Sequence, residues 1–346
     1  MAVSRGMAVP VFVAAGAGAW GPVQELRGRP EIRLVASPRR ASVLLVAGRV
    51  AASHVPALDR VHDQMPHPRA VVAWSSETDR PAVGTAVHDG IDALCSVIGD
   101  VFARLRRQPE TSTPDLLADE DPNEWRGVGP FGQGGEGMMG GTPYGRPMAM
   151  TGEDRDGLAL DQLRLRLGPF LEWLPPGVSL DVTMQGEVLQ EVVPRLAPPT
   201  ADDVGAAVPD AATGDVADDL RWLALGLHIH GLGALSARAA TLAGTGGGDP
   251  RAVERLCRSV RRSGLLWSVR GIGWIDGLGD VSDRWQERLA RLGRVDDDID
   301  APGPHVGLTW SGLADELRGS TLTDAVSTVV SLHDRLVEPI EELTRP

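Results

Sequence analysis

Residues 36–74, ASPRRASVLLVAGRVAASHVPALDRVHDQMPHPRAVVAW, hold two short apolar segments with a helical pattern between them. Residues 43–47 and 70–74 are apolar and partly β-branched, which is typical of strands buried in a parallel sheet. Between them, four apolar residues recur at the spacing of one helix face: Val55, Leu58, Val61 and Met65. A strand, a helix and a second strand in this order predict a β-α-β unit.

The flanking segments extend this unit. Residues 10–14 and 31–36 have the same strand-like composition. Residues 87–107 repeat apolar positions at helical spacing and end in a basic turn, which suits the negative end of the helix dipole. The sequence therefore predicts a small α/β domain over residues 1–108.

The residues after the first strand carry a glycine motif. In VPVFVAAGAGAWG, residues 9–21, Gly16, Gly18 and Gly21 have the G-x-G-x-x-G spacing of a dinucleotide-binding turn. That turn needs a helix directly after it and an acidic residue at the end of the second strand. Here prolines and a glycine leave room for about two helical turns, and the second strand ends in LVASPRR. Arg39 and Arg40 would suit a 2′-phosphate, so an NADP-dependent reductase stays open as an alternative.

Residues 36–74 closely resemble the cluster-bearing small subunit of respiratory complex I and its membrane-bound hydrogenase relatives. That family has an A-S-P-R-x-A-D-V-x-x-V-x-G block, then a helix ending in Y-D-Q-M-P-x-P-[KR], then a strand. The matching family-motif residues include Ser37, Pro38, Arg39, Asp63, Gln64, Met65 and Pro66. The resemblance implies a small, flavodoxin-like parallel sheet.

The cysteine ligands of that family are missing from the matching places. The family has a tandem cysteine pair after the first strand and a third cysteine after the Met-Pro motif, where this chain has AGAGAWG and AWSSETDR. A fourth cysteine, in a C-P-P turn, has no counterpart. Cys95 and Cys257 cannot supply the four thiolates of an iron–sulfur cluster. We therefore predict no metal and no cofactor, with the glycines filling the former cluster loop.

Residues 167–196 resemble the start of the quinone-binding large subunit of the same family, where a G-P-Q-H-P-x-x-H-G loop precedes a strand and a D-G-E-V-V turn. The family's quinone-site histidines would fall near Leu171 and Pro175, which cannot donate a side-chain hydrogen bond. The resemblance thus implies a vestigial quinone loop, formed here by Gly168, Pro169, Glu172 and Trp173.

Residues 109–157 are first acidic and then rich in glycine and methionine. We expect a linker or, preferably, a loop that binds a partner subunit through adaptable apolar side chains. Its candidate contact residues are Gly134, Gly137, Met138, Met139, Tyr144, Arg146, Met148 and Met150.

The rest of the chain predicts a second, α+β part. Residues 158–196 predict a β-hairpin region and residues 197–215 a second linker, and residues 216–346 predict a helical bundle like part of the large subunit. In the bundle, apolar residues from Leu220 to Leu242 predict one helix, Pro250 opens another, and residues 281–292 and 321–344 add two more. His228 and His230 face different sides of their helix, so we expect a core or interface role for one of them rather than a shared metal.

The charge balance excludes several classes of partner. All 34 basic residues are arginine, and 47 acidic residues give a net charge of −13. This argues against a nucleic-acid partner and against electrostatic attachment to anionic lipid. No apolar run is long enough to span a membrane. We expect an accessory, non-catalytic subunit of a complex-I-like oxidoreductase, in the cytoplasm at the inner face of the membrane and bound through membrane and peripheral partner subunits. A free-standing assembly or scaffold protein is a further alternative.

Overall fold

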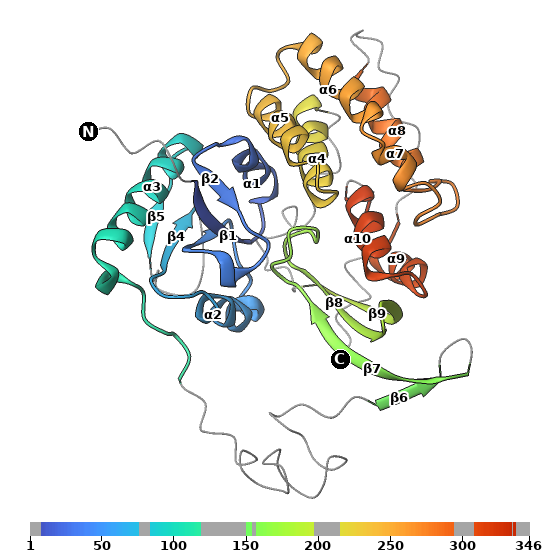
Figure 1. Cartoon of the computed structure of the whole chain (residues 1–346), viewed down its shortest axis with the longest axis horizontal. Coiled ribbons are helices and arrows are strands. Elements are labelled where there is room, and N and C mark those ends of the chain that lie inside the picture. Colours follow the sequence, from blue (N-terminus) through green and yellow to red (C-terminus); the bar gives the residue numbers. More distant parts are fainter. Residues whose placement is uncertain are drawn as a thin grey trace, which may run out of the picture.

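The first part of the chain is a parallel sheet. The computed structural model describes residues 8–75, 84–118, 150–153, 157–196, 215–293, 308–333 and 335–336. Five strands, β1 (Val9–Ala15), β2 (Ile32–Leu34), β3 (Val43–Ala47), β4 (Ala70–Trp74) and β5 (Thr85–Val87), pair in the order β2-β1-β3-β4-β5. Every pairing is parallel, which confirms the predicted flavodoxin-like α/β class (Figure 1).

Helices cover both faces of this sheet. On one face α1 (Trp20–Glu25) and α3 (Ile91–Arg107) pack on β1, β3 and β4, and on the other α2 (Val55–Asp63) packs on Phe12 and Leu44. Four short 3-10 helices complete the connections: η1 (Leu26–Gly28), η2 (Pro38–Arg40), η3 (Ala52–His54) and η4 (Pro109–Thr111). The helix predicted over 87–107 begins later, at Ile91, because Thr85–Val87 pairs with β4 instead.

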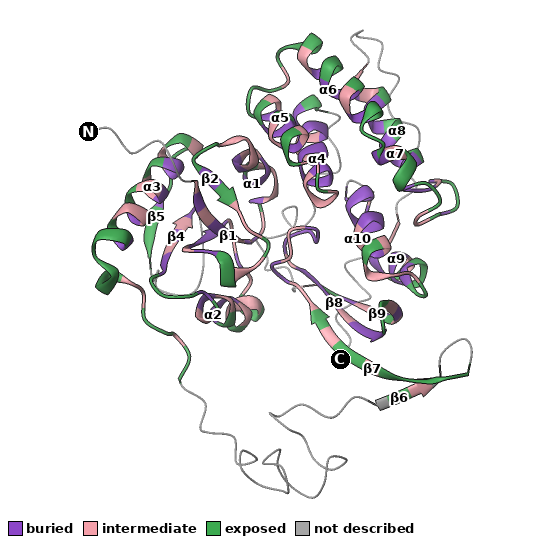
Figure 2. Cartoon of the chain, in the orientation of Figure 1, coloured by how far each residue is buried: buried purple, intermediate pink, exposed green. Residues whose placement is uncertain are grey.

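The second part begins with an antiparallel sheet in the order β6-β7-β8-β9. Strands β8 (Val178–Gln185) and β9 (Val188–Leu196) form the predicted hairpin, with Gly186 at φ +58° in its turn. Strands β6 (Met150–Glu153) and β7 (Ala159–Leu167) were not predicted. Most of β7 is exposed on both sides (Figure 2), although residues 163–167, LRLRL, alternate apolar and polar side chains as a strand does.

Seven helices follow among the described residues: α4 (Val216–Ile229), α5 (Gly233–Gly244), α6 (Pro250–Arg262), α7 (Leu265–Ser268), α8 (Val281–Leu292), α9 (Trp310–Leu317) and α10 (Leu322–Ser331). The single helix predicted from Leu220 to Leu242 is wrong, because Gly231 turns the chain at φ +77° and separates α4 from α5. Helix α9 was not predicted, and α10 ends at Ser331, well before the predicted end.

The two parts meet where α1 and η1 pack against α4 and α5. In the glycine- and methionine-rich segment, Met150 begins β6, while the other candidate contact residues, from Gly134 to Met148, lie outside the described residues. Within the described ranges, no helix combines the length and hydrophobicity needed to cross a bilayer.

Candidate functional site

The glycines after β1 serve chain packing. A Cβ on Gly16 would overlap the carbonyl of Arg49, because the loops after β1 and β3 pair at Ala17 and Arg49. Gly18 has φ +78°, a conformation that suits glycine. Gly21 lies in α1, where an added Cβ would be 3.3 Å from Cδ of Arg221. Gly16 and Gly21 therefore lie close to other parts of the protein's own chain. In a dinucleotide-binding turn, glycines at these positions would instead make room for a pyrophosphate.

Arg39 and Arg40, the other half of the NADP alternative, lie elsewhere. They end η2, and Ser42 just after it donates its amide to the carbonyl of Pro10 at the beginning of β1. The glycines follow the other end of that strand. The two arginines and the glycine motif therefore lie at opposite ends of β1. They do not form the single site that NADP binding would need.

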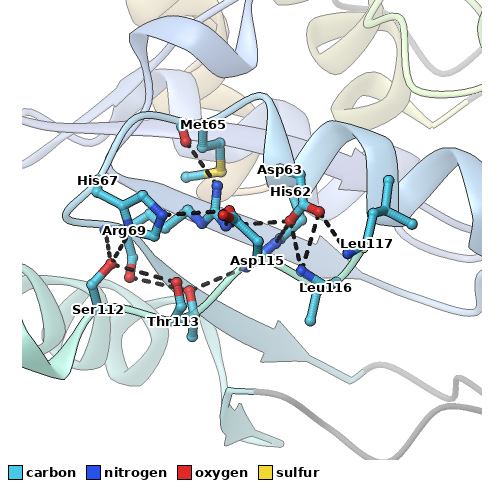
Figure 3. A network of polar contacts seen from close by, with 10 residues as sticks. All are labelled: His62, Asp63, Met65, His67, Arg69, Ser112, Thr113, Asp115, Leu116 and Leu117. Carbon is cyan, nitrogen blue, oxygen red and sulfur yellow. Dashed lines mark hydrogen bonds and ion pairs between the residues drawn. The ribbon is translucent and has the colours of Figure 1, made fainter. Parts of the chain in front are cut away.

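The Asp-Gln-Met-Pro motif anchors the chain that leaves α3 (Figure 3). Asp63 accepts hydrogen bonds from the amides of Leu116 and Leu117, at 3.0 Å and 2.8 Å, and His62 bridges Asp63 and Thr113. Burial alone would raise the pKa of Asp63, but the hydrogen bonds from His62 and the two amides outweigh burial and lower it. The motif thus fixes residues 112–117 against the end of α2.

Arg69 is the buried cation of this network. Its side chain is 1% exposed, and it donates to the carbonyl of Met65 at 2.9 Å, to Asp63 at 3.2 Å and to Asp115. The hydrogen bond from Arg69 lowers the pKa of Asp115. Met65 itself is buried with Phe12 and Leu44 under the sheet. Ser37 and Pro38 open η2, and Gln64 caps the end of α2, so these motif residues lie at the turns that close the unit.

The loop of Gly168, Pro169, Glu172 and Trp173 is a wedge between the two parts of the molecule. Phe170 packs under the parallel sheet with Phe12, whereas Trp173 packs into the core shared by β8, β9, α9 and α10. The carbonyl of Trp173 hydrogen-bonds with Nε2 of His333 at 2.9 Å. The loop therefore contributes side chains to two separate cores.

Glu172 lies between charged groups from both parts. Its carboxylate is 2.9 Å from Nη2 of Arg27 in η1 and 3.5 Å from Nε2 of His228 in α4. Burial would raise the pKa of Glu172, but the hydrogen bond from His228 and the charge of Arg27 lower it to about 2. Close by, Glu25 in α1 pairs with Arg221 in α4 at 2.6 Å, which forms a second ionic link between the two parts.

A cavity of about 150 Å³ opens beside this cluster. Its lining includes Trp20 and Arg27 from the first part and Phe170, Glu172 and Trp173 from the wedge. Within the described part of the chain, Nε1 of Trp20 and Nη1 of Arg27 are buried without a hydrogen-bond partner. The walls are mainly apolar, so the cavity suits an apolar group carrying one hydrogen-bond acceptor.

Comparisons with known proteins point to one kind of relative. The chain is similar to the NADH-quinone oxidoreductase B-subunit 1 of Herpetosiphon aurantiacus, at 41% identity over 85 residues, which is 24% of this chain and 46% of the relative. The corresponding B-subunit 2 of Chloroflexus aurantiacus is 50% identical over 72 residues, 19% of this chain and 38% of the relative. The N-terminal part is related to the B-subunit of complex I.

The relationship covers only part of either protein. An NADH-quinone oxidoreductase B-subunit from Nocardioides sp. is 53% identical over 38 residues, 11% of this chain and 21% of the relative. The chain thus spans less than half the length of these curated relatives. No protein-family model matches the chain. The resemblance of residues 167–196 to the large subunit stays a prediction.

The residues present do not fit an iron–sulfur cluster of the complex I kind. Cys95 on α3 packs in the sheet core, and Cys257 on α6 packs in the helical core. Burial raises the pKa of Cys95 to about 11, which disfavours the thiolate that a metal needs. Among the described residues, no three His, Cys, Asp or Glu side chains are placed to share a metal ion.

Sequence reasoning missed the ionic cluster around Glu172. Arg27 lies between the glycine motif and the second predicted strand, and His228 lies in a predicted helix, 145 and 56 positions along the chain from Glu172 respectively. The one sequence feature that indicated this cluster was the core or interface role expected for either His228 or His230. His230 faces the other way and lies 5.9 Å from the ring of Trp285.

Proposed function

We propose that the chain is an accessory, non-catalytic subunit of a complex-I-like membrane oxidoreductase. One observation carries the proposal: a segment similar in sequence to the complex I B-subunit has, where that family carries its cluster loop, a glycine, Gly16, packed against the Arg49 carbonyl. The sheet of this segment retains the shape that neighbouring subunits would recognise. It lacks the thiolates that would hold an electron carrier.

The wedge loop supports the same proposal. If it descends from a quinone loop, its polar side chains have become a link between two parts of one chain, because Glu172 is already paired with Arg27 and His228. A carboxylate so paired, with its pKa lowered to about 2, is a poor proton donor at neutral pH. The role proposed for the wedge is to hold the two parts in register.

Partner subunits would bring the protein to the inner face of the cell membrane. Tagged protein should accordingly appear in the membrane fraction and be released together with partner subunits by mild detergent. Recovery as a single soluble species, from cells whose membrane complex is intact, would contradict the accessory-subunit role. Recovery with the complex only during its assembly would favour the scaffold alternative.

Metal content and catalysis test the non-catalytic part of the proposal. The purified chain should contain well under one iron per molecule and should neither oxidise NADH nor reduce a soluble quinone. In the assembled complex, Glu172→Gln should leave turnover within about twofold, provided that assembly is unharmed. Stoichiometric iron with a reducible cluster signal, or a tenfold loss of turnover, would show that the chain carries chemistry.

A further inference from the structure

Two tryptophans on one segment are far more exposed than the rest. Trp267 on α7 is 78% exposed, and Trp274 in the following loop is 65% exposed. The other tryptophans that the structure describes are buried or half-buried. A large apolar side chain held in water marks a surface that contacts something else.

The helix before these tryptophans carries a stripe of positive charge. Arg251, Arg255, Arg258 and Arg262 follow the spacing of one face of α6, and all four are exposed. The opposite face, including Val253 and Leu256, is buried in the helical core. The stripe runs for about 17 Å, from the 1.5 Å rise per residue of an α-helix.

The charge of this region differs sharply from that of the whole chain. Residues 250–280, from the start of α6 to the residue before α8, contain six arginines and three acidic residues, Glu254, Asp276 and Asp280, whereas the whole chain has a net charge of −13. Arg258 pairs with Glu254 and Arg255 with Asp249. Among the described residues, no acidic side chain forms an ion pair with Arg251, Arg262 or Arg270. We name the four stripe arginines, Arg270, Trp267 and Trp274 the Arg–Trp surface.

We propose that the Arg–Trp surface binds the anionic surface of a phospholipid bilayer directly. The guanidinium group matches phosphate geometry, and tryptophan favours the boundary between headgroups and acyl chains. The surface lies along α6, α7 and the loop before α8, at the outer edge of the molecule away from the parallel sheet (Figures 1 and 2). This contact goes beyond the proposed function, in which partner subunits alone bring the chain to the membrane.

Lipid suits this surface better than a protein partner does. A row of exposed arginines followed along the chain by two exposed tryptophans suits a planar, charged and deformable surface. The acidic remainder of the chain opposes binding only weakly, because salt screens charges beyond about 8 Å.

Vesicle flotation with the purified full-length chain tests the proposal. At physiological ionic strength, protein should float with vesicles of phosphatidylcholine and phosphatidylglycerol, and not with phosphatidylcholine alone. Arg262→Gln/Arg270→Gln should weaken binding by about fivefold per arginine. The matched control Arg106→Gln/Arg107→Gln, at the exposed end of α3, should bind like the wild type.

A second pair of variants tests the tryptophans. Trp267→Ala/Trp274→Ala should weaken vesicle binding and abolish the blue shift of tryptophan emission that insertion causes. Leu158→Ala/Leu163→Ala removes exposed apolar side chains at and beside β7 and should change neither.

Several results would overturn the proposal. One is that the protein does not float with the mixed vesicles at all, and another is that the test and control variants lose vesicle binding equally. Displacement of the protein from vesicles by inorganic phosphate or duplex DNA, at equal phosphate concentration, would also overturn it. Variants that float normally but no longer co-purify with partner subunits would show that the surface docks a protein instead.

Discussion

Glu172→Gln removes the charge that links the two parts of the molecule. The pKa of Glu172 falls from 4.5 to about 2 in the fold. That difference corresponds to a stabilisation of about 3 kcal/mol by the ionised carboxylate. Arg27 has a side chain that is 4% exposed and would lose its charged partner, although glutamine still offers it an acceptor oxygen. We expect Glu172→Gln to lower the free energy of unfolding at pH 7 by about 2–3 kcal/mol.

The pH dependence gives this prediction a sharper test. Because the folded-state pKa lies below the unfolded value, the contribution of Glu172 is complete above pH 4.5 and is lost as the pH falls toward 2. Urea unfolding, followed by circular dichroism, should show that the difference between wild type and variant shrinks by about half at pH 3. Comparing the two proteins at each pH cancels the titration of other carboxylates.

A matched change elsewhere controls for the loss of one negative charge. Glu316→Gln, at an exposed position of α9, should alter the free energy of unfolding by less than about 0.5 kcal/mol. If Glu172→Gln changes stability no more than Glu316→Gln at pH 7, or if the difference does not shrink in acid, the wedge is not held by its charge.

Two further substitutions test other contacts by urea unfolding. Gly16→Ala should lower the free energy of unfolding by about 1–3 kcal/mol, because its Cβ would overlap the Arg49 carbonyl. The control Gly99→Ala, in α3, has open space around its Cβ and should raise the free energy of unfolding by about 0.5–1 kcal/mol. An unchanged stability in Gly16→Ala would refute the packing role. Arg69→Met should lower the free energy of unfolding by about 3 kcal/mol and speed hydrogen exchange of the Leu116 amide, because Asp63 loses its buried cation. The control Arg104→Met, at an exposed position, should leave both quantities unchanged. Unchanged amide exchange in Arg69→Met would contradict the anchoring role.

Local patterns predicted the parallel sheet well. Residues 43–47 and 70–74 form β3 and β4 with the predicted bounds, because β3 is buried on both faces, β4 is buried on one and half-buried on the other, and both apolar runs are continuous. β7 was missed even though residues 163–167, LRLRL, alternate apolar and polar side chains, and α4 and α5 were merged because the apolar spacing continues across Gly231. The spacing of apolar residues gives no sign that one residue, here Gly231, adopts the left-handed conformation and ends the helix.

The candidate site was less predictable than the fold. The resemblance identified Gly168 and Glu172 as positions of interest, yet nothing local indicates that Glu172 meets Arg27, because pairing over such separations depends on tertiary packing. The Arg–Trp surface was also missed. Net charge averages over the whole chain and conceals a local excess of arginine.

The wedge joins groups that, in a two-chain assembly, would have to find each other by diffusion. In one chain, their encounter is intramolecular, and a tether can supply an effective concentration in the millimolar range. Contacts too weak to hold two free proteins together can therefore hold these two parts together. That tolerance suits a junction in which α1 and η1 pack on α4 and α5, a few ion pairs add to the packing, and a cavity of about 150 Å³ remains. Separately expressed halves, lacking the tether, should fail to associate at micromolar concentration.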